Sequence, residues 1–193
     1  MKEWYFAPGN HADIEGFTDG NMAHFNEDYQ KHTARECVQN ILDQRAFLNR
    51  PAKVHFKLLS VPIDQAIPER SKFTKILREN YSYYMNDKKA SAFLKKSLKV
   101  IDKDTIDILI ISDYQTYGLK GIASLGDAAR GTQWDNLIIR RGSSKREGVG
   151  GGTYGIGKHA PFGVSSLRTV FYYTETANDK KGSLSFNAMV GVS

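Results

Sequence analysis

The chain has 193 residues, of which 40% are hydrophobic and 25% charged, values that are ordinary for a globular domain with its own core. No stretch approaches the ~18 apolar residues of a membrane-spanning helix, and the N-terminus lacks the apolar core of a signal peptide. The single cysteine, Cys37, excludes an internal disulfide framework and is typical of a reducing compartment. These features predict a cytoplasmic protein without membrane contact, with one domain that fills residues 1–193.

The first half of the chain shows helical and strand periodicity in turn. A helical pattern over 33–48 ends before Pro51, and 53–61 alternates like a strand. The apolar positions of that first helix are Ala34, Val38, Ile41, Leu42 and Leu48. Residues 62–104 then form a basic helical insertion, in which 71–100 predicts two short helices.

The second half begins with a continuous apolar run at 106–112, which predicts a strand buried on both faces. Glycine, serine and charged residues dominate 114–152, which predicts a long irregular segment of functional importance. A helix is expected over 155–167, and two hairpin strands over 168–175 and 183–192. Because the chain stops inside the last strand pattern, we expect it to be an N-terminal fragment of a longer protein.

Positive charge is concentrated in residues 70–103, which contain ten lysines and arginines against three carboxylates. Aromatic residues are interleaved with these cations: Phe73, Tyr81, Tyr83, Tyr84 and Phe93. Such a composition is typical of a surface that binds nucleic acid by charge and stacking, or of one that binds acidic partners. A solvated helix face is the alternative interpretation of the same residues.

Three groups of residues have the chemistry of a nucleotide site. In the first, spacings of four and three place Glu36, Asn40 and Asp43 on one side of the predicted helix, opposite its apolar stripe. An amide oxygen beside carboxylates suits Mg²⁺, and a free carboxylate can deprotonate water. The alternative is an amphipathic helix whose polar face lies in water.

The second group is Asp113, at the end of the predicted buried strand, followed by Gly118. A carboxylate at a strand end can accept a hydrogen bond from an exocyclic amine such as adenine N6. The glycine lets the backbone turn close to a flat ring. An ordinary strand-ending turn explains the same pattern.

The third group is a glycine-rich run from Gly150 to Gly157 that ends on Lys158 and leads into a predicted helix. Bare N–H groups at such a junction, with a lysine beside them, favour an anion. The run nearly spells a P-loop, but His159 stands where Ser or Thr would hold Mg²⁺, and no hydrophobic strand precedes it. The P-loop interpretation is therefore rejected.

Together and in this order, the three groups resemble the GHKL superfamily of gyrase, heat-shock chaperones, MutL, histidine kinases and MORC ATPases. Glu36, Asn40 and Asp43 are similar to its E-x-x-x-N-x-x-D box. Asp113 with Gly118 is similar to its adenine box, although DYQTYG departs from D-x-G-x-G. The glycine run is similar to its phosphate box, and it is closest to the chaperone and MORC versions. The resemblance covers residues 25–192.

This resemblance implies a Bergerat fold, an α/β (α+β) two-layer sandwich with a mixed, mostly antiparallel sheet and helices on one face. Glu36 would be the general base, Asn40 the Mg²⁺ ligand, and Asp43 and Asp113 would face the nucleotide, with Asp113 on adenine N6. Residues 115–151 would form the ATP lid. The phosphate-binding residues would be Gly152, Gly155, Ile156, Gly157 and Lys158. The family's closing strand often brings a threonine to adenine, and no residue is assigned to that role from the sequence.

The expected function is therefore a Mg²⁺-dependent ATPase, slow in the isolated domain, whose nucleotide state switches conformation or drives homodimerisation of the full-length protein. Glu36 favours water over a protein histidine as the phosphoryl acceptor. The alternative function is a nucleic-acid or protein-interaction module whose nucleotide pocket is degenerate, with residues 70–103 as its binding surface.

Overall fold

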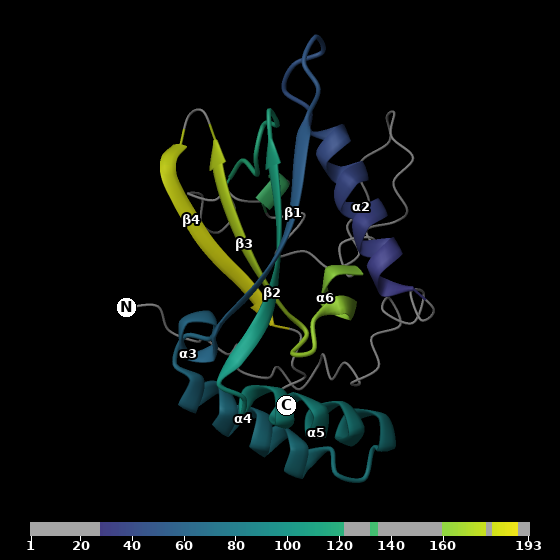
Figure 1. Cartoon of the computed structure of the whole chain (residues 1–193), viewed down its shortest axis with the longest axis vertical. Helices are drawn as coiled ribbons and strands as arrows, with labels where there is room; N and C mark the ends of the chain where they lie inside the picture. The colour runs from purple at the N-terminus through teal and green to yellow at the C-terminus, as the bar shows by residue number, and fades with distance from the viewer. Residues whose placement is uncertain (1–27, 122–131, 135–159, 177–178, 189–193) are drawn as a thin grey trace.

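The computed structural model describes residues 28–121, 132–134, 160–176 and 179–188, and Figure 1 shows their arrangement. The elements in chain order are α2 (Tyr29–Asp43), β1 (Lys53–Pro62), α3 (Ile63–Ala66), α4 (Arg70–Tyr83), α5 (Lys88–Ile101), β2 (Thr105–Tyr114), α6 (Ala160–Val164), β3 (Thr169–Thr176) and β4 (Asp179–Ala188). This mixture of helices and antiparallel strands confirms the α+β class. No helix in the described ranges has the length and apolar content that crossing a bilayer requires.

The described strands form two antiparallel pairs, β1 with β2 and β3 with β4, instead of the single mixed sheet that was expected. The β1–β2 register runs from Lys53 opposite Tyr114 to Pro62 opposite Thr105. The two pairs meet where the backbone N–H of Leu119, beyond the end of β2, donates to Thr174 Oγ1 on β3 (2.8 Å). The two pairs are thus joined by a hydrogen bond between a loop N–H and a side chain. Neighbouring strands of a continuous sheet would instead be joined by a series of backbone hydrogen bonds.

Strand β2 is not buried on both faces, so that prediction from its continuous apolar run is wrong. Leu109 and Ile110 are consecutive and therefore point to opposite faces of the strand. They are 44% and 38% exposed, respectively. The run belongs to an antiparallel pair whose two faces both keep contact with solvent, and not to a central parallel strand.

Helix α2 starts and ends earlier than its apolar pattern indicated. The Asp28 side chain caps its first turn by accepting a hydrogen bond from the Lys31 N–H (3.1 Å). The helix ends at Asp43 because the next residues bond to the loop after β2: an isolated bridge pairs Arg45 with Thr116. Leu48, placed in the helix by its spacing, lies outside it and is 90% exposed.

The insertion between β1 and β2 is built from helices, as predicted, with a break before Asp87. Asp87 caps α5 by accepting hydrogen bonds from the N–H groups of Lys89 and Ala90, both at 2.9 Å. Helices α4 and α5 pack together across the end of the strands where β1 finishes and β2 begins (Figure 1).

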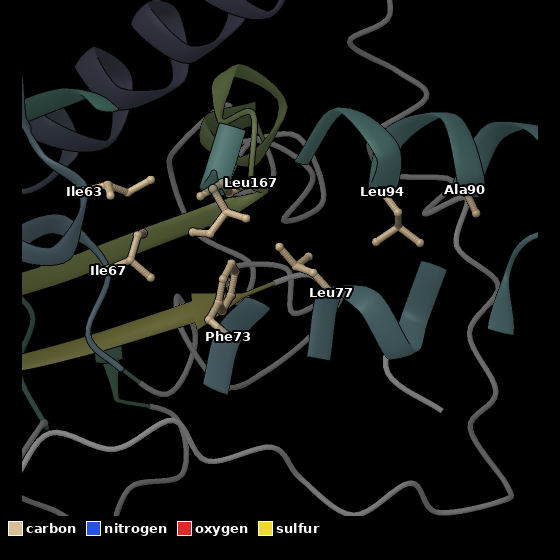
Figure 2. Packing of buried hydrophobic residues seen from close by; sticks show 8 residues of the cluster. Ile63, Ile67, Phe73, Leu77, Ala90, Leu94 and Leu167 are labelled. Carbon is tan, nitrogen blue, oxygen red and sulfur yellow. The ribbon is translucent and has the colours of Figure 1, made fainter. Parts of the chain in front are cut away.

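The largest hydrophobic cluster lies in this insertion. Figure 2 shows Phe73 and Leu77 of α4 pointing toward Leu167, with Leu94 of α5 beside them. Its buried members are Ile63, Ile67, Phe73, Leu77, Ala90, Leu94, Ile101 and Leu167. Helix α5 is also tied to the segment before β3, because Ser97 Oγ donates to the Ser166 carbonyl (3.1 Å).

The C-terminal elements follow the expected order with different bounds. Helix α6 is five residues long, and residues 155–159, where the predicted helix began, lie outside the described part of the chain. Strand β3 agrees closely with its prediction, whereas β4 begins four residues before the predicted 183–192 segment.

Candidate functional site

One side of helix α2, here called the α2 edge, carries Glu36, Cys37 and Asn40 next to the buried residues of the helix. Its buried residues are Thr33 and Ile41, and Cys37, one turn from each, is half-buried. At about 100° per residue, Asn40 and Glu36 follow Cys37 around one side of the helix. Glu36 is half-buried and Asn40 is exposed, so the two side chains lie beside the buried residues of α2 on a side that reaches solvent. Neither forms a hydrogen bond or ion pair with another side chain in the described ranges.

The loop after β2 pairs with the residues after α2, where an isolated bridge joins Arg45 to Thr116. Burial raises the pKa of the Cys37 thiol to about 11, and the negative charges of Glu36 and then Asp113 contribute. Burial also raises the pKa of Tyr172 on β3, with a further contribution from Cys37. Cys37 on α2 is thus near enough to Asp113 on β2 and to Tyr172 on β3 for their charges to interact, although 135 residues separate Cys37 from Tyr172 in sequence numbering.

Asp113 keeps part of its hydrogen-bonding capacity free. Its Oδ2 accepts a hydrogen bond from the Thr116 hydroxyl, and its Oδ1 has no partner among the described residues. Two residues on, Gln115 has a left-handed backbone (φ 64°), and its buried Oε1 has no described hydrogen-bond donor. Unusual backbone geometry and unpartnered buried acceptors are both features that cluster at ligand sites.

The loop after Asp113 is fastened to the end of α2. The Ala46 N–H donates to the Gln115 carbonyl, and the Tyr117 N–H donates to the Gln44 carbonyl, both at 2.9 Å. Gln133 Nε2 donates to Gln44 Oε1 (2.7 Å). The first residues of the segment predicted as a lid, 115–121, are therefore held in place against α2.

Gly118 lies where the loop passes closest to β3. Its φ is 67°, and a Cβ there would come within 2.7 Å of the Glu175 carbonyl oxygen, so any larger residue would strain the turn. The neighbouring Thr174, 7% exposed, accepts the Leu119 N–H bond. No sequence pattern singled out Thr174, because only the position of β3 in the fold shows that Thr174 and Thr176 lie beside Gly118.

Asp43 is further from the buried edge than Glu36 and Asn40. It is exposed, and its Oδ1 accepts a hydrogen bond from Gln39 Nε2 on the same helix (3.0 Å). The structure therefore gives Asp43 a local partner, and it bonds the loop that contains Gly118 to the residues after α2.

The glycine-rich group, Gly152 to Lys158 with Gly155, Ile156 and Gly157, lies outside the described residues. Helix α6, which follows it, packs on α2. The contact is close: a Cβ on Gly163 would come within 2.0 Å of the Tyr29 ring. The helix that follows the glycine run in sequence thus packs against the N-terminal part of α2.

The donors near the α2 edge are hard oxygen atoms, the amide of Asn40 and the carboxylate of Glu36, which suit Mg²⁺ when phosphate oxygens and water complete its coordination. In the described ranges no group of three His, Cys, Asp or Glu side chains could hold a metal ion by itself.

Comparisons with models of protein families, with curated proteins and with solved structures found no match to this chain. The function of the site therefore has to be inferred from the α2 edge, the free acceptors at the end of β2 and the fastened loop between them.

Proposed function

We propose that this chain binds ATP with Mg²⁺ and hydrolyses the ATP, in a Bergerat-type fold similar to that of the GHKL ATPases. The observation that carries the proposal is the bonding of the residues after α2 to the loop after β2. The Ala46 N–H donates to the Gln115 carbonyl, and the Tyr117 N–H donates to the Gln44 carbonyl. This pairing supports a shared site for the helix that contains the candidate general base, Glu36, and the strand that ends near the candidate adenine ligand, Asp113.

Recognition of adenine would use the acceptors at the end of β2. The exocyclic amine offers two hydrogens, and the unpartnered oxygens of Asp113 and Gln115 are acceptors for such a group. Gly118 contributes the tight turn that brings the loop backbone against β3, with the loop fixed by its bonds to α2 and Thr174. A preformed loop lowers the entropic cost of binding a flat ligand.

Hydrolysis would use the edge of α2. The Glu36 carboxylate takes a proton from a water molecule as its oxygen forms a bond to the γ-phosphorus. The bond to the β,γ-bridging oxygen breaks, which yields ADP and phosphate. Asn40 would hold Mg²⁺, which neutralises phosphate charge when bound. The half-buried position of Glu36 limits competing solvent while leaving its carboxylate unpaired in the described structure.

The remaining parts of the proposal concern segments outside the described residues. The glycine run would bind the phosphates, with Lys158 as a point charge. Residues 115–151 would form the ATP lid, whose described start is bonded to the residues after α2 and to Thr174. Its closure over ATP would accompany homodimerisation of a longer, cytoplasmic protein.

Two substitutions test the proposal separately for chemistry and for binding. Glu36→Gln keeps the size of the side chain but removes the base, so turnover should fall by ~10²–10⁴ while ATP affinity is retained. Asp113→Asn places a donor opposite the adenine amine and should weaken binding by about 1–3 kcal/mol, or roughly 5- to 150-fold in Kd.

The matched control is Asp107→Asn, which removes the same charge from the other end of β2, where Asp107 is exposed opposite Ser60. Titration calorimetry with ATP and Mg²⁺ and a phosphate-release assay provide the readouts. Equal effects of the Asp107 and Asp113 substitutions, or no heat of ATP binding to the unaltered chain, would overturn the proposal.

A further inference from the structure

The outer face of α5 is a lysine ridge. At about 100° per residue, its five helical lysines fall within an arc of about 120°, opposite the buried side of the helix. They are Lys88, Lys89, Lys95, Lys96 and Lys99, and all five are exposed. The buried side consists of Ala90, Leu94, Ser97 and Ile101.

None of these five lysines has an ion-pair partner in the described part of the chain. In this respect α5 differs from its neighbour α4. On α4, Lys72 Nζ lies 3.9 Å from Glu69 Oε2, and Lys75 Nζ lies 3.9 Å from Glu79 Oε1. The one carboxylate at the start of α5, Asp87, is occupied as the N-cap. The positive charge of α4 is therefore partly neutralised, whereas that of α5 is not.

The lysine ridge works against the stability of its own helix. Lys88 and Lys89 occupy the first turn, where the helix dipole disfavours positive charge, and that turn contains no acidic residue. Lys95 and Lys99 are four residues apart and repel each other. Charge placed against local preference, as at Lys88 and Lys89, is expected where a partner supplies the opposite charge.

The packing of the helical pair restricts what that partner can be. The apolar side of α5 is buried against α4, so α5 has no free apolar face to insert into a lipid surface. Base stacking is also restricted, because Phe73 is buried and Tyr81, Tyr84 and Phe93 pack against the core. Of the five interleaved aromatic residues, Tyr83 of α4, 64% exposed, is the one mainly open to solvent, and it does not lie on α5.

We propose that the lysine ridge binds the phosphate backbone of a double-stranded nucleic acid, without reading its bases. Five unpaired ammonium groups on one rigid helix match a regular array of phosphates, and no exposed aromatic side chain of α5 competes for stacking with single strands. This surface lies on the insertion and does not depend on the proposed ATPase activity.

Binding of a fluorescent 20-base-pair DNA duplex to the 193-residue chain, followed by anisotropy at several salt concentrations, tests the proposal. Five contacts predict a slope of about −4.5 in log K against log salt, and a loss on the order of 500-fold between 50 and 200 mM salt. Replacing Lys95 and Lys99 by Gln should reduce the slope to about −2.7 and weaken binding at 100 mM by roughly 10- to 100-fold.

The matched control replaces Lys72 and Lys75 by Gln, which removes the same charge from α4 and should change the slope by less than one. A second variant, Lys88→Gln with Lys89→Gln, should bind the duplex more weakly. Its melting temperature should stay equal or rise, because no cation then lies at the positive end of the helix dipole. A merely structural role for these lysines would lower the melting temperature instead.

Four results would overturn the proposal. These are no duplex binding at 50 mM salt, equal losses in the α4 and α5 variants, tighter binding of a single-stranded 20-mer, and binding of phosphatidylserine vesicles in preference to the duplex. ATP calorimetry on the same variants should be unchanged, so failure here is distinguishable from failure of the ATPase proposal.

Discussion

The helical insertion and the candidate nucleotide site are held together by different forces. In the insertion, α3, α4 and α5 bury apolar side chains against one another, and only Leu167 of the buried cluster comes from elsewhere. Around the site, hydrogen bonds predominate: backbone groups of 44–46 pair with 115–117, and Thr174 anchors Leu119. The segment that interrupts the sequence motifs thus provides most of the described core, while Asp113 and Gly118 lie in a region of directional polar contacts.

This difference fits what each region would have to do. Apolar packing is non-directional and tolerates modest rearrangement, so it stabilises a scaffold. Hydrogen bonds fix particular atoms in place, which suits a loop that must present acceptors to a ligand. We therefore expect core substitutions in the insertion to affect stability, and polar substitutions at the site to affect geometry more than stability.

The largest effect is expected from Phe73→Ala. The side chain is 1% exposed at the centre of the cluster in Figure 2, and its removal leaves a cavity between α4 and Leu167. The free energy of unfolding should fall by about 3–5 kcal/mol in urea denaturation. Met85→Ala, at a 65% exposed apolar residue beside the same helices, is the control and should change it by about 0.5 kcal/mol or less. Similar losses in both variants would show that this cluster is not the stabilising core.

A smaller effect is expected from Thr174→Val, which removes the acceptor of the Leu119 N–H while keeping the shape of the side chain. An unpartnered buried N–H should cost about 1–3 kcal/mol of stability. Amide exchange of 118–121 should accelerate, and ATP should bind more weakly. Thr174→Ser retains the hydroxyl and should restore both properties. If Thr174→Ser behaves like Thr174→Val, the methyl group and not the hydrogen bond supports the loop.

The smallest effect is a pH dependence that arises at Cys37. Burial, with Glu36 and Asp113, raises the folded-state pKa of its thiol from 9.0 to about 11. Between these values the unfolded chain loses a proton that the folded chain keeps, so stability is complete below pH 9 and falls as pH rises toward 11. The loss at pH 10 should be on the order of 1 kcal/mol.

Urea denaturation at pH 7 and pH 10 measures this change in the free energy of unfolding. Cys37→Ala should remove it, and Tyr172→Phe should reduce the further loss at higher pH, because burial raises the pKa of Tyr172 in the same direction. A Cys37→Ala variant with undiminished pH dependence would place the responsible group elsewhere.

Local periodicity predicted the elements that local forces form. The two insertion helices and β1 lie close to their expected positions, because amphipathic spacing, the Asp87 cap and alternation act within a few residues. The bounds of α2 and the burial of β2 were predicted wrongly. Both depend on groups far away in sequence: the loop at 115–117 that ends α2, and the number of layers that cover β2.

The sequence by itself determined which residues could do chemistry, since the types and spacings of Glu36, Asn40 and Asp113 are properties of the chain alone. Only the tertiary structure decided that the α2 edge meets the end of β2, that Thr174 supports the loop, and that the lysines of α5 lack partners that those of α4 have. The physical reason is the distance along the sequence over which each property is determined. Spacing along a helix is set by covalent geometry, whereas burial, free acceptors and unpaired charge depend on which distant segments pack together.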